Sequence, residues 1–329
     1  MKVLVLGNKE RYLRYMPDLP ITKHVEICYH SILDPQEEIL QDGADAQVIA
    51  ADAIAKVDRA LIDQMPNLQL IHSEGVAYNA FDCQAAAERG IYVCNNKGVN
   101  ATAVAEQTIL LMLAALRQLV PGDAAVRSGQ QIQKKEAVMV QGLTELGDCT
   151  VGLLGFGDIG QATAKRLTGF GCRVLYHCRH PKEEAIEQVC GAHWVSKEEL
   201  LAQSDILSLH VPVTPETRGS VDADFLKQMK TGALLINTAR GEIVNSLAVR
   251  QALIVGKLSG AGFDTLAPEP NRIDDPLIDL PAEIQERVVY SPHIAGSTIR
   301  TFRRTHLHVW QNVQRLAEGK RPDCIVNGI

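Results

Sequence analysis

Residues 151–160 read VGLLGFGDIG, and this stretch decides the fold of the chain. The apolar run Val151–Leu154 leads directly into Gly155, Gly157 and Gly160, and a helical pattern (DIGQATAKRL) follows. A strand, a glycine turn and the start of a helix, in that order, are typical of a site for the pyrophosphate of a dinucleotide. The pattern GxGxxG alone also occurs in ordinary strand–turn–helix units, so its context carries the prediction.

Each glycine of this motif has a physical reason to be there. We expect Gly155 to make the tight turn, Gly157 to let the backbone approach the phosphates, and Gly160 to let the helix pack against the strand. The free N–H groups and the positive dipole end of the helix then face the anion. The motif therefore predicts a Rossmann-type dinucleotide-binding domain.

Length, composition and charge bound the class of protein. A chain of 329 residues is long for a single core, which favours two domains. Hydrophobic residues make up 46% and charged residues 22%, as in ordinary globular proteins. The net charge of −6 and the lack of a basic run argue against binding to nucleic acid or to a membrane surface. The longest apolar stretch, Ile109–Leu116, is shorter than the roughly 20 residues that a membrane span needs.

The cysteines and the N-terminus indicate the compartment. Eight cysteines are scattered without a CxxC pair, so we predict no metal site, no redox motif and reduced core thiols. The first residues, MKVLVLGNKE, show no signal-peptide pattern. Both observations favour the reducing cytoplasm.

Short apolar runs alternate with helical patterns along most of the chain. This alternation predicts an α/β fold with parallel sheets covered by helices on both faces. The first sheet region has no dinucleotide motif of its own, since Gly7 is followed by Asn8, Lys9 and Glu10, so we expect a flavodoxin-like substrate domain there. We expect a long helix at 102–118 to bridge the domains and the last helix, 301–318, to pack on the first region. The strand-like runs are 3–6, 47–51, 68–73, 91–94, 150–154, 173–177, 205–211, 233–237, 258–263 and 287–292.

Three polar residues lie where strand-like runs end. Arg240 follows ALLINTA, Glu269 lies in DTLAPEP, and His293 follows VVYSP. Ligands of open parallel sheets bind outside the carboxyl ends of the strands, where loops bring distant residues together. Singly, each could be a surface or turn residue. Together, after a nucleotide motif, they predict a catalytic group.

Several segments resemble the D-isomer-specific 2-hydroxyacid dehydrogenases, over nearly the whole chain. The resemblance implies a substrate-binding domain of residues 1–100 plus 296–329, a coenzyme domain of residues 101–295, and a homodimer built through the helix near 102–118. The segments are ERGIYVCNNKGVNATAVAEQTILLML (88–113), VGLLGFGDIG (151–160), SDILSLHVPVTPETRG (204–219), MKTGALLINTARGEIVN (229–245), GAGFDTLAPEP (260–270) and SPHIAGST (291–298).

The same resemblance implies a role for each catalytic residue. His293 would donate the proton during reduction and accept it during oxidation, as suits an imidazole. Glu269 would orient the ring and favour the imidazolium. Arg240 would bind the substrate carboxylate and polarise the adjacent carbonyl. The implied substrate-binding set is Gly75, Val76, Ala77, Arg240 and His293, the first three through backbone N–H groups.

A further set of residues is implied for the nicotinamide cofactor. Asp264 resembles the residue beside the nicotinamide, although an Asp that caps a turn after a strand is the alternative. The full set is Gly155, Phe156, Gly157, Asp158, Ile159, Gly160, Cys178, Arg179, His210, Val211, Pro212, Thr217, Thr238, Ala239, Arg240, Asp264, His293 and Gly296.

The residues after the second strand of this domain bear on cofactor choice. An NAD site usually carries an Asp or Glu about 20 residues after the glycines. Here His177 and Cys178 occupy that position, Arg179 follows, and no carboxylate appears before Glu183. A missing acid removes repulsion of a 2′-phosphate, and Arg179 could pair with it. We therefore predict a preference for NADP, with use of NAD left open.

The sequence of the loop after 47–51 limits which class of substrate the chain is expected to bind. Related enzymes that bind phosphorylated acids tend to carry arginines there, whereas this chain carries Asp52. A small unphosphorylated 2-oxo acid such as glyoxylate or hydroxypyruvate is the first hypothesis. The alternatives are a phosphoglycerate dehydrogenase without a regulatory domain and a nucleotide-sensing corepressor. Formate dehydrogenases rank lower, because they generally have Gln where Glu269 stands.

Overall fold

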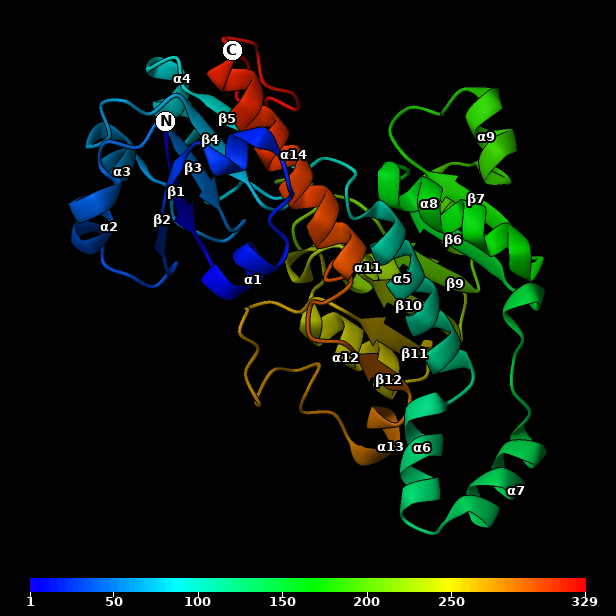
Figure 1. Cartoon of the computed structure of the whole chain (residues 1–329). Coiled ribbons are helices and arrows are strands. Elements are labelled where there is room, and N and C mark those ends of the chain that lie inside the picture. The colour runs from blue at the N-terminus through cyan, green and yellow to red at the C-terminus, as the bar shows by residue number, and fades with distance from the viewer. The chain divides into compact units, whose positions relative to one another are not determined.

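The computed structural model describes residues 1–329, and the chain divides into two compact units. Unit 1 comprises Met1–Asn100 and Ser297–Ile329, and unit 2 comprises Ala101–Gly296. Each unit is built on one parallel sheet flanked by helices (Figure 1), so the predicted α/β class is confirmed.

The sheet of unit 1 has five parallel strands in the order β2-β1-β3-β4-β5. This is the flavodoxin-like order, in which the chain crosses from β2 over β1 to β3. The strands are β1 (Lys2–Leu6), β2 (Glu26–His30), β3 (Val48–Ala51), β4 (Leu70–Ser73) and β5 (Tyr92–Cys94), and the helices of the unit are α1 (Lys9–Arg14), α2 (Gln36–Gly43), α3 (Arg59–Asp63), α4 (Cys83–Glu88) and α14 (Ile299–Ala317).

Alternation along the strands divides the core of unit 1 into two layers. Val3 and Val5 point to the face where Trp310 of α14 is buried, whereas Leu4 and Leu6 point to the opposite face. The side chain of Thr298 caps α14 by accepting a hydrogen bond from the N–H of Thr301. The last helix therefore packs on the first sheet region, as predicted.

The sheet of unit 2 has seven parallel strands in the order β12-β11-β10-β9-β6-β7-β8. Its order reverses between β6 and β9, which is the place where open sheets of this kind bind ligands. The strands are β6 (Thr150–Leu154), β7 (Arg173–His177), β8 (Ala192–Trp194), β9 (Ile206–Leu209), β10 (Ala233–Asn237), β11 (Leu258–Phe263) and β12 (Val288–Tyr290).

The helices of unit 2 cover both faces of this sheet. Helix α5 packs against α8 and against β10, β11 and β12, so the predicted long helix lies within unit 2. No single helix has the length and apolar content to cross a membrane; the pair α5 and α6, bent by 61°, meets those two criteria only when taken together. The helices are α5 (Ala101–Leu116), α6 (Leu119–Arg127), α7 (Gln131–Gln141), α8 (Asp158–Leu167), α9 (Glu184–Cys190), α10 (Lys197–Gln203), α11 (Ala223–Gln228), α12 (Ser246–Ile254) and α13 (Ala282–Gln285).

All ten strand-like runs of the sequence contain a strand, but two edge strands were missed. Strand β2 (EICYH) buries only Cys28 fully, and β8 (AHW) buries only Ala192. Edge strands have one hydrogen-bonded neighbour and carry exposed polar residues, so they lack the continuous apolar run that marks a central parallel strand.

Candidate active site

The glycine turn after β6 has the geometry that a bound pyrophosphate requires. Gly155 has φ of 99°, and a Cβ atom there would lie 2.5 Å from the carbonyl oxygen of His210. A Cβ atom at Gly160 would lie 2.6 Å from the carbonyl oxygen of Gly155. In contrast, a Cβ atom at Gly157, which precedes α8, would have no heavy atom within 4 Å, and no side chain caps the helix start with a hydrogen bond. The first N–H groups of α8 are therefore accessible to an anion.

The other predicted residues line up along one edge of the same sheet. Because all seven strands are parallel, their carboxyl ends meet at that edge, about 4.8 Å apart from strand to strand. From one side to the other, the strand ends are followed by Cys178 and Arg179 (β7), the glycine turn (β6), His210 (β9), Arg240 (β10), Asp264 and Glu269 (β11), and His293 (β12).

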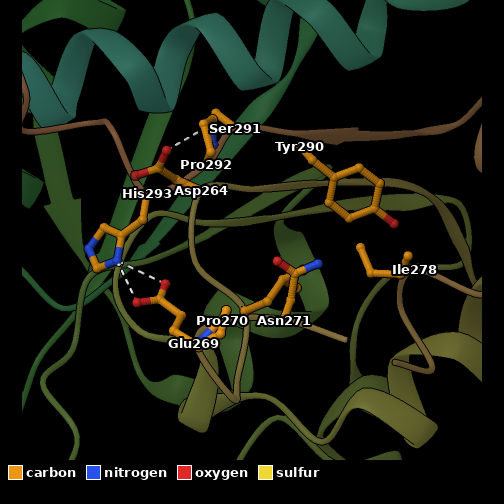
Figure 2. Close-up of a pocket in the computed structure, with 10 residues that line it drawn as sticks. Asp264, Glu269, Pro270, Asn271, Ile278, Tyr290, Ser291, Pro292 and His293 are labelled. Atoms are coloured by element: carbon orange, nitrogen blue, oxygen red, sulfur yellow. Dashed lines mark hydrogen bonds and ion pairs between the residues drawn. The ribbon is translucent and has the colours of Figure 1, made fainter. Parts of the chain in front are cut away.

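His293 and Glu269 form a direct pair at this edge. The Nδ1 atom of His293 lies 2.8 Å from Oε1 and 2.9 Å from Oε2 of Glu269. Figure 2 shows the imidazole ring facing the carboxylate. Both side chains line a pocket of about 390 Å³. The two side chains are 45% and 48% exposed, and Nε2 of His293 has no partner in the protein. The ring can therefore present Nε2 to a ligand while Glu269 holds Nδ1.

The backbone at His293 is also unusual. Its φ is +53°, a conformation that few residues other than glycine adopt. The N–H of His293 donates to the carbonyl oxygens of Asp264 (2.8 Å) and Ser291 (3.0 Å), and these bonds hold the turn. Backbone strain of this kind clusters at functional sites.

Asp264 ties the His293 turn to β11. Its Oδ1 atom accepts hydrogen bonds from the Ser291 hydroxyl (2.5 Å) and the Ile294 N–H (3.1 Å), and its Oδ2 atom accepts one from the Ala295 N–H (3.0 Å). The carboxylate is 3% exposed, so these bonds replace its hydration. The turn-capping alternative for Asp264 is thus seen directly. Ser291 is a contributor that the sequence patterns did not single out.

Arg240 lies on the neighbouring strand end. Its Nη1 atom donates to its neighbour's carbonyl, Ala239 O, at 2.7 Å, and its guanidinium makes no hydrogen bond or ion pair with Glu269 or His293. The next residue, Gly241, packs on the segment that leads to Glu269, where a Cβ atom would collide with the carbonyl carbon of Leu266 at 2.1 Å. The structure therefore brings the backbone next to Arg240 beside that segment, and no hydrogen bond or ion pair joins the Arg240 side chain to Glu269 or His293.

Other residues predicted for the cofactor are engaged within the protein. The hydroxyl of Thr238 bonds to that of Thr108 on α5 at 2.8 Å, and the hydroxyl of Thr217 donates to the carbonyl oxygen of Pro212 at 2.6 Å. Nε2 of His210 lies 2.9 Å from the Ser208 hydroxyl. Burial lowers the pKa of His210 to about 4, so its ring is neutral near pH 7.

The end of β7 carries no carboxylate. Trp194 Nε1 donates to the carbonyl oxygen of Cys178 at 3.1 Å, and Nδ1 of His177 lies 2.9 Å from the carbonyl oxygen of Val195. Arg179 is exposed and makes no hydrogen bond or ion pair. A hydrogen bond from Thr214 lowers the pKa of Glu216, and the charge of Arg179 adds to this effect.

In unit 1, the loop after β4 is held by its own polar residues. The hydroxyl of Ser73 donates to the carbonyl oxygen of Ala77 at 2.7 Å and accepts from the N–H of Gly75 at 3.0 Å. The side chain of Asn96 donates to the carbonyl oxygen of Ser73 at 2.7 Å. Of the three predicted N–H donors, Gly75 is thus already paired, whereas Val76 and Ala77 have no partner.

All eight cysteines are free, and no group of three or more His, Cys, Asp or Glu side chains is arranged to hold a metal ion.

Comparison with known proteins gives a consistent result. Residues 109–295 match the family described as D-isomer specific 2-hydroxyacid dehydrogenase, NAD binding domain. A glyoxylate reductase of Thermococcus litoralis is 38% identical over 297 residues, covering 89% of this chain and 87% of that protein.

Two solved structures are similar over almost their whole length. A glyoxylate reductase from Paecilomyes thermophila has 28% identity and a TM-score of 0.82, covering 99% of this chain and 98% of that one. A D-lactate dehydrogenase from Aquifex aeolicus, complexed with NAD and lactic acid, has 28% identity and a TM-score of 0.79, covering 97% of this chain and 96% of that one. The chain therefore belongs to the D-isomer-specific 2-hydroxyacid dehydrogenases, oxidoreductases that act on a CH–OH group with a nicotinamide dinucleotide.

Proposed function

We propose that the enzyme reduces a small unphosphorylated 2-oxo acid, of the glyoxylate or hydroxypyruvate kind, to the 2-hydroxy acid. The observation that carries this proposal is the pair formed by His293 and Glu269 at the carboxyl edge of the unit 2 sheet, with Nδ1 and Oε1 2.8 Å apart. The similarity to proteins named glyoxylate reductase supports the choice of a small acid.

Each residue of the site has a separate role in the proposed reduction. When bound, the nicotinamide supplies the hydride for the carbonyl carbon. Protonated His293 gives the proton on Nε2 to the carbonyl oxygen, while Glu269 accepts a hydrogen bond from Nδ1 and stabilises the positive ring. Arg240 offers a planar fork of donors to the substrate carboxylate, and its charge polarises the adjacent carbonyl.

The loop after β4 is the second element of the proposal. The unpaired N–H groups of Val76 and Ala77 are suited to bind the substrate carboxylate, since a backbone donor without a partner is satisfied by an anion. Ser73 and Asn96 keep the loop in this conformation. The N–H of Gly75 already donates to the Ser73 hydroxyl, so Gly75 shapes the loop but offers no free donor to the substrate.

The proposed cofactor preference is NADP over NAD. Arg179 is exposed and makes no hydrogen bond or ion pair at the end of β7, where it can bind a 2′-phosphate, and the residues that directly follow β7 include no carboxylate for the ribose hydroxyls. The open surroundings of Gly157 and the free start of α8 suit the pyrophosphate.

We also propose a homodimer in the cytoplasm. Helices α5, α6 and α7 carry large apolar side chains that remain exposed: Leu110, Leu119, Val120, Val126, Ile132, Met139 and Val140. Exposed apolar side chains on these neighbouring helices offer a surface that a second copy of the chain can cover. The eight free cysteines favour a reducing compartment. Light scattering of the purified enzyme tests the dimer.

A substrate panel tests the activity directly. The wild-type enzyme is assayed with glyoxylate, hydroxypyruvate and longer 2-oxo acids, each with NADPH and with NADH, by nicotinamide absorbance. We expect the smallest unphosphorylated acids and NADPH to give the highest kcat/KM. Replacement His293→Ala should lower kcat by about 100-fold or more while nucleotide binding persists. The variant His193→Ala, at an exposed histidine of β8, is the matched control. Near-normal kcat in His293→Ala would remove this residue from proton transfer.

A further inference from the structure

A cluster of charged residues lies at the carboxyl edge of the unit 1 sheet, next to the loop after β4. Nη2 of Arg11, on α1, lies 2.8 Å from Oδ2 of Asp52 and 2.5 Å from Oε2 of Glu74. Asp52 follows β3 and Glu74 follows β4, so one guanidinium joins two neighbouring strand ends. The side chain of Glu74 is only 6% exposed, whereas those of Arg11 and Asp52 are 27% and 23% exposed.

This cluster stands directly beside the backbone donors of the loop. Glu74 precedes Gly75, and the N–H of Glu74 donates to the carbonyl oxygen of Ala51 at 2.7 Å. A Cβ atom at Gly75 would lie 2.8 Å from Cβ of Ala53, so the loops after β3 and β4 are in contact. An acid whose carboxylate sits on the N–H groups of Val76 and Ala77 therefore has its remaining atoms within a few ångströms of these loops.

The charges of the cluster do not cancel. One guanidinium faces two carboxylates, and both carboxylates accept from the same Nη2 atom, so a single positive charge is shared between two negative groups. Lys9, the next cation on α1, lies over the ring of Tyr29, 5.2 Å from its centroid, and pairs with neither carboxylate. A second anionic group on a substrate would meet excess negative charge here. At about 6 Å and intermediate dielectric, one such charge changes an equilibrium constant about tenfold.

We propose that Arg11, Asp52 and Glu74 form a charge filter that admits 2-oxo acids with an uncharged or cationic distal group and rejects those with a second anionic group. This inference rests on the proposed reduction of 2-oxo acids. Arg11 and Glu74 become specificity-determining residues, in addition to Asp52. Asp52 and Glu74 neutralise the positive charge of Arg11, which would otherwise attract an anionic group.

The filter also has a built-in dependence on pH. Burial raises the pKa of Glu74 to about 7, against the opposite effect of Arg11. The other groups that face Glu74 are Asp52 and His306 of α14, whose Nε2 lies 3.8 Å from Oε1. Burial lowers the pKa of His306 to about 4, so it stays neutral. Tyr12 of α1 is buried next to His306 and is also uncharged, because burial raises its pKa. Between pH 6 and pH 8 the cluster therefore gains negative charge at Glu74 alone.

The first test compares two acids that differ by one phosphate. The ratio of kcat/KM for phosphohydroxypyruvate to that for hydroxypyruvate is measured in the full-length enzyme and in Asp52→Asn. We expect the ratio to rise at least about tenfold, because the variant loses one repelling charge and frees part of Arg11. The double variant Asp52→Asn with Arg11→Gln should lose most of this gain.

Asp34→Asn is the matched control for the first test. Asp34 follows β2 at the same edge but pairs with His30, at 3.3 Å, so its removal should leave the ratio unchanged. An unchanged ratio in Asp52→Asn, or an equal rise in Asp34→Asn, would overturn the filter. A gain that survives the loss of Arg11 would overturn the role of Arg11. Absence of turnover with every 2-oxo acid in the wild type would instead contradict the proposed function.

The second test uses pH with a pair of acids whose charges stay constant from pH 6 to pH 8. The kcat/KM ratio of oxaloacetate to 2-oxobutyrate cancels any pH dependence that the two reductions share. We expect the ratio to fall up to about tenfold as the pH rises in the wild type, and to stay flat in Glu74→Gln. The same slope in Glu74→Gln would remove Glu74 from the filter.

Discussion

Nδ1 of His293 lies 2.8 Å from Oε1 of Glu269, although 24 residues separate them in the chain. The contact exists because β11 and β12 are parallel neighbours whose carboxyl ends meet at one edge of the sheet. An imidazolium beside a carboxylate is stabilised by a charge-assisted hydrogen bond, about twice as strong as a neutral one. The pair therefore holds a proton-donating ring in a fixed orientation.

The Glu269→Gln variant tests the charge of this pair. A glutamine keeps a hydrogen-bond acceptor but removes the negative charge that stabilises the protonated ring. We expect kcat for reduction to fall about 10- to 100-fold. Steady-state rates at saturating cofactor and 2-oxo acid measure the effect. Glu283→Gln, an exposed residue of α13, serves as the control, and a kcat close to wild type in Glu269→Gln would contradict the role of the charge.

The Asp264→Asn variant tests the turn that carries His293. The amide can accept through one oxygen only, so the N–H of Ala295 or its neighbours loses a buried acceptor. An unpaired buried donor costs about 1–3 kcal/mol, which corresponds to a fall of about 2–12 °C in the unfolding midpoint of a unit of this size. Differential scanning calorimetry measures it. Asp224→Asn, on the exposed surface of α11, should change little; an unchanged midpoint in Asp264→Asn would refute the capping role.

The Arg179→Ala variant tests cofactor choice. If Arg179 pairs with the 2′-phosphate, its loss should raise KM for NADPH about tenfold and leave KM for NADH nearly constant. Both constants come from initial rates with one 2-oxo acid. Arg173→Ala removes an exposed arginine at the start of the same strand and should alter neither constant. Equal changes for the two cofactors in Arg179→Ala would argue against the phosphate contact.

Stability should depend on acid through histidines whose pKa burial lowers. The pKa falls to about 3 at His72 and to about 4 at His210 and His306, from an ordinary 6.5. Below pH 6.5 these histidines bind protons in the unfolded chain but stay neutral in the folded protein. The free energy of unfolding therefore falls as the pH drops towards 4. Each such histidine contributes up to about 1.4 kcal/mol per pH unit in that window. Glu74 has a raised pKa, so its protonation in the folded state increases the free energy of unfolding as the pH falls over a similar range.

Urea unfolding between pH 8 and pH 4 measures this dependence, followed separately for each unit by hydrogen exchange. His210 reports on unit 2 without the opposing effect of Glu74, which lies in unit 1. The variant His24→Gln, at an exposed histidine of unit 1, should reproduce the wild-type profile. A stability of unit 2 that stays constant from pH 6.5 to pH 4 would be inconsistent with a neutral buried His210.

The local architecture of the chain could be predicted from the order of its residues. Continuous apolar runs marked the central strands, because a parallel strand covered by helices on both faces must be apolar throughout. The glycines of VGLLGFGDIG marked the nucleotide turn, since Gly155 needs a positive φ and Gly160 has no room for a Cβ atom. His293 and Glu269 could be named because each follows a strand at the edge where ligands bind.

Which polar groups are paired and which are free could not be predicted in this way, because it depends on contacts between distant segments. Arg11, Asp52 and Glu74 meet across 41 and 63 residues of sequence, a contact that no local pattern encodes. The Ser73 hydroxyl accepts from the N–H of Gly75, which was predicted to be free for the substrate. Asp264 uses both carboxylate oxygens to hold the His293 turn. Hydrogen bonds are short and directional, so their partners depend on the packed positions of distant strands rather than on residue type or spacing.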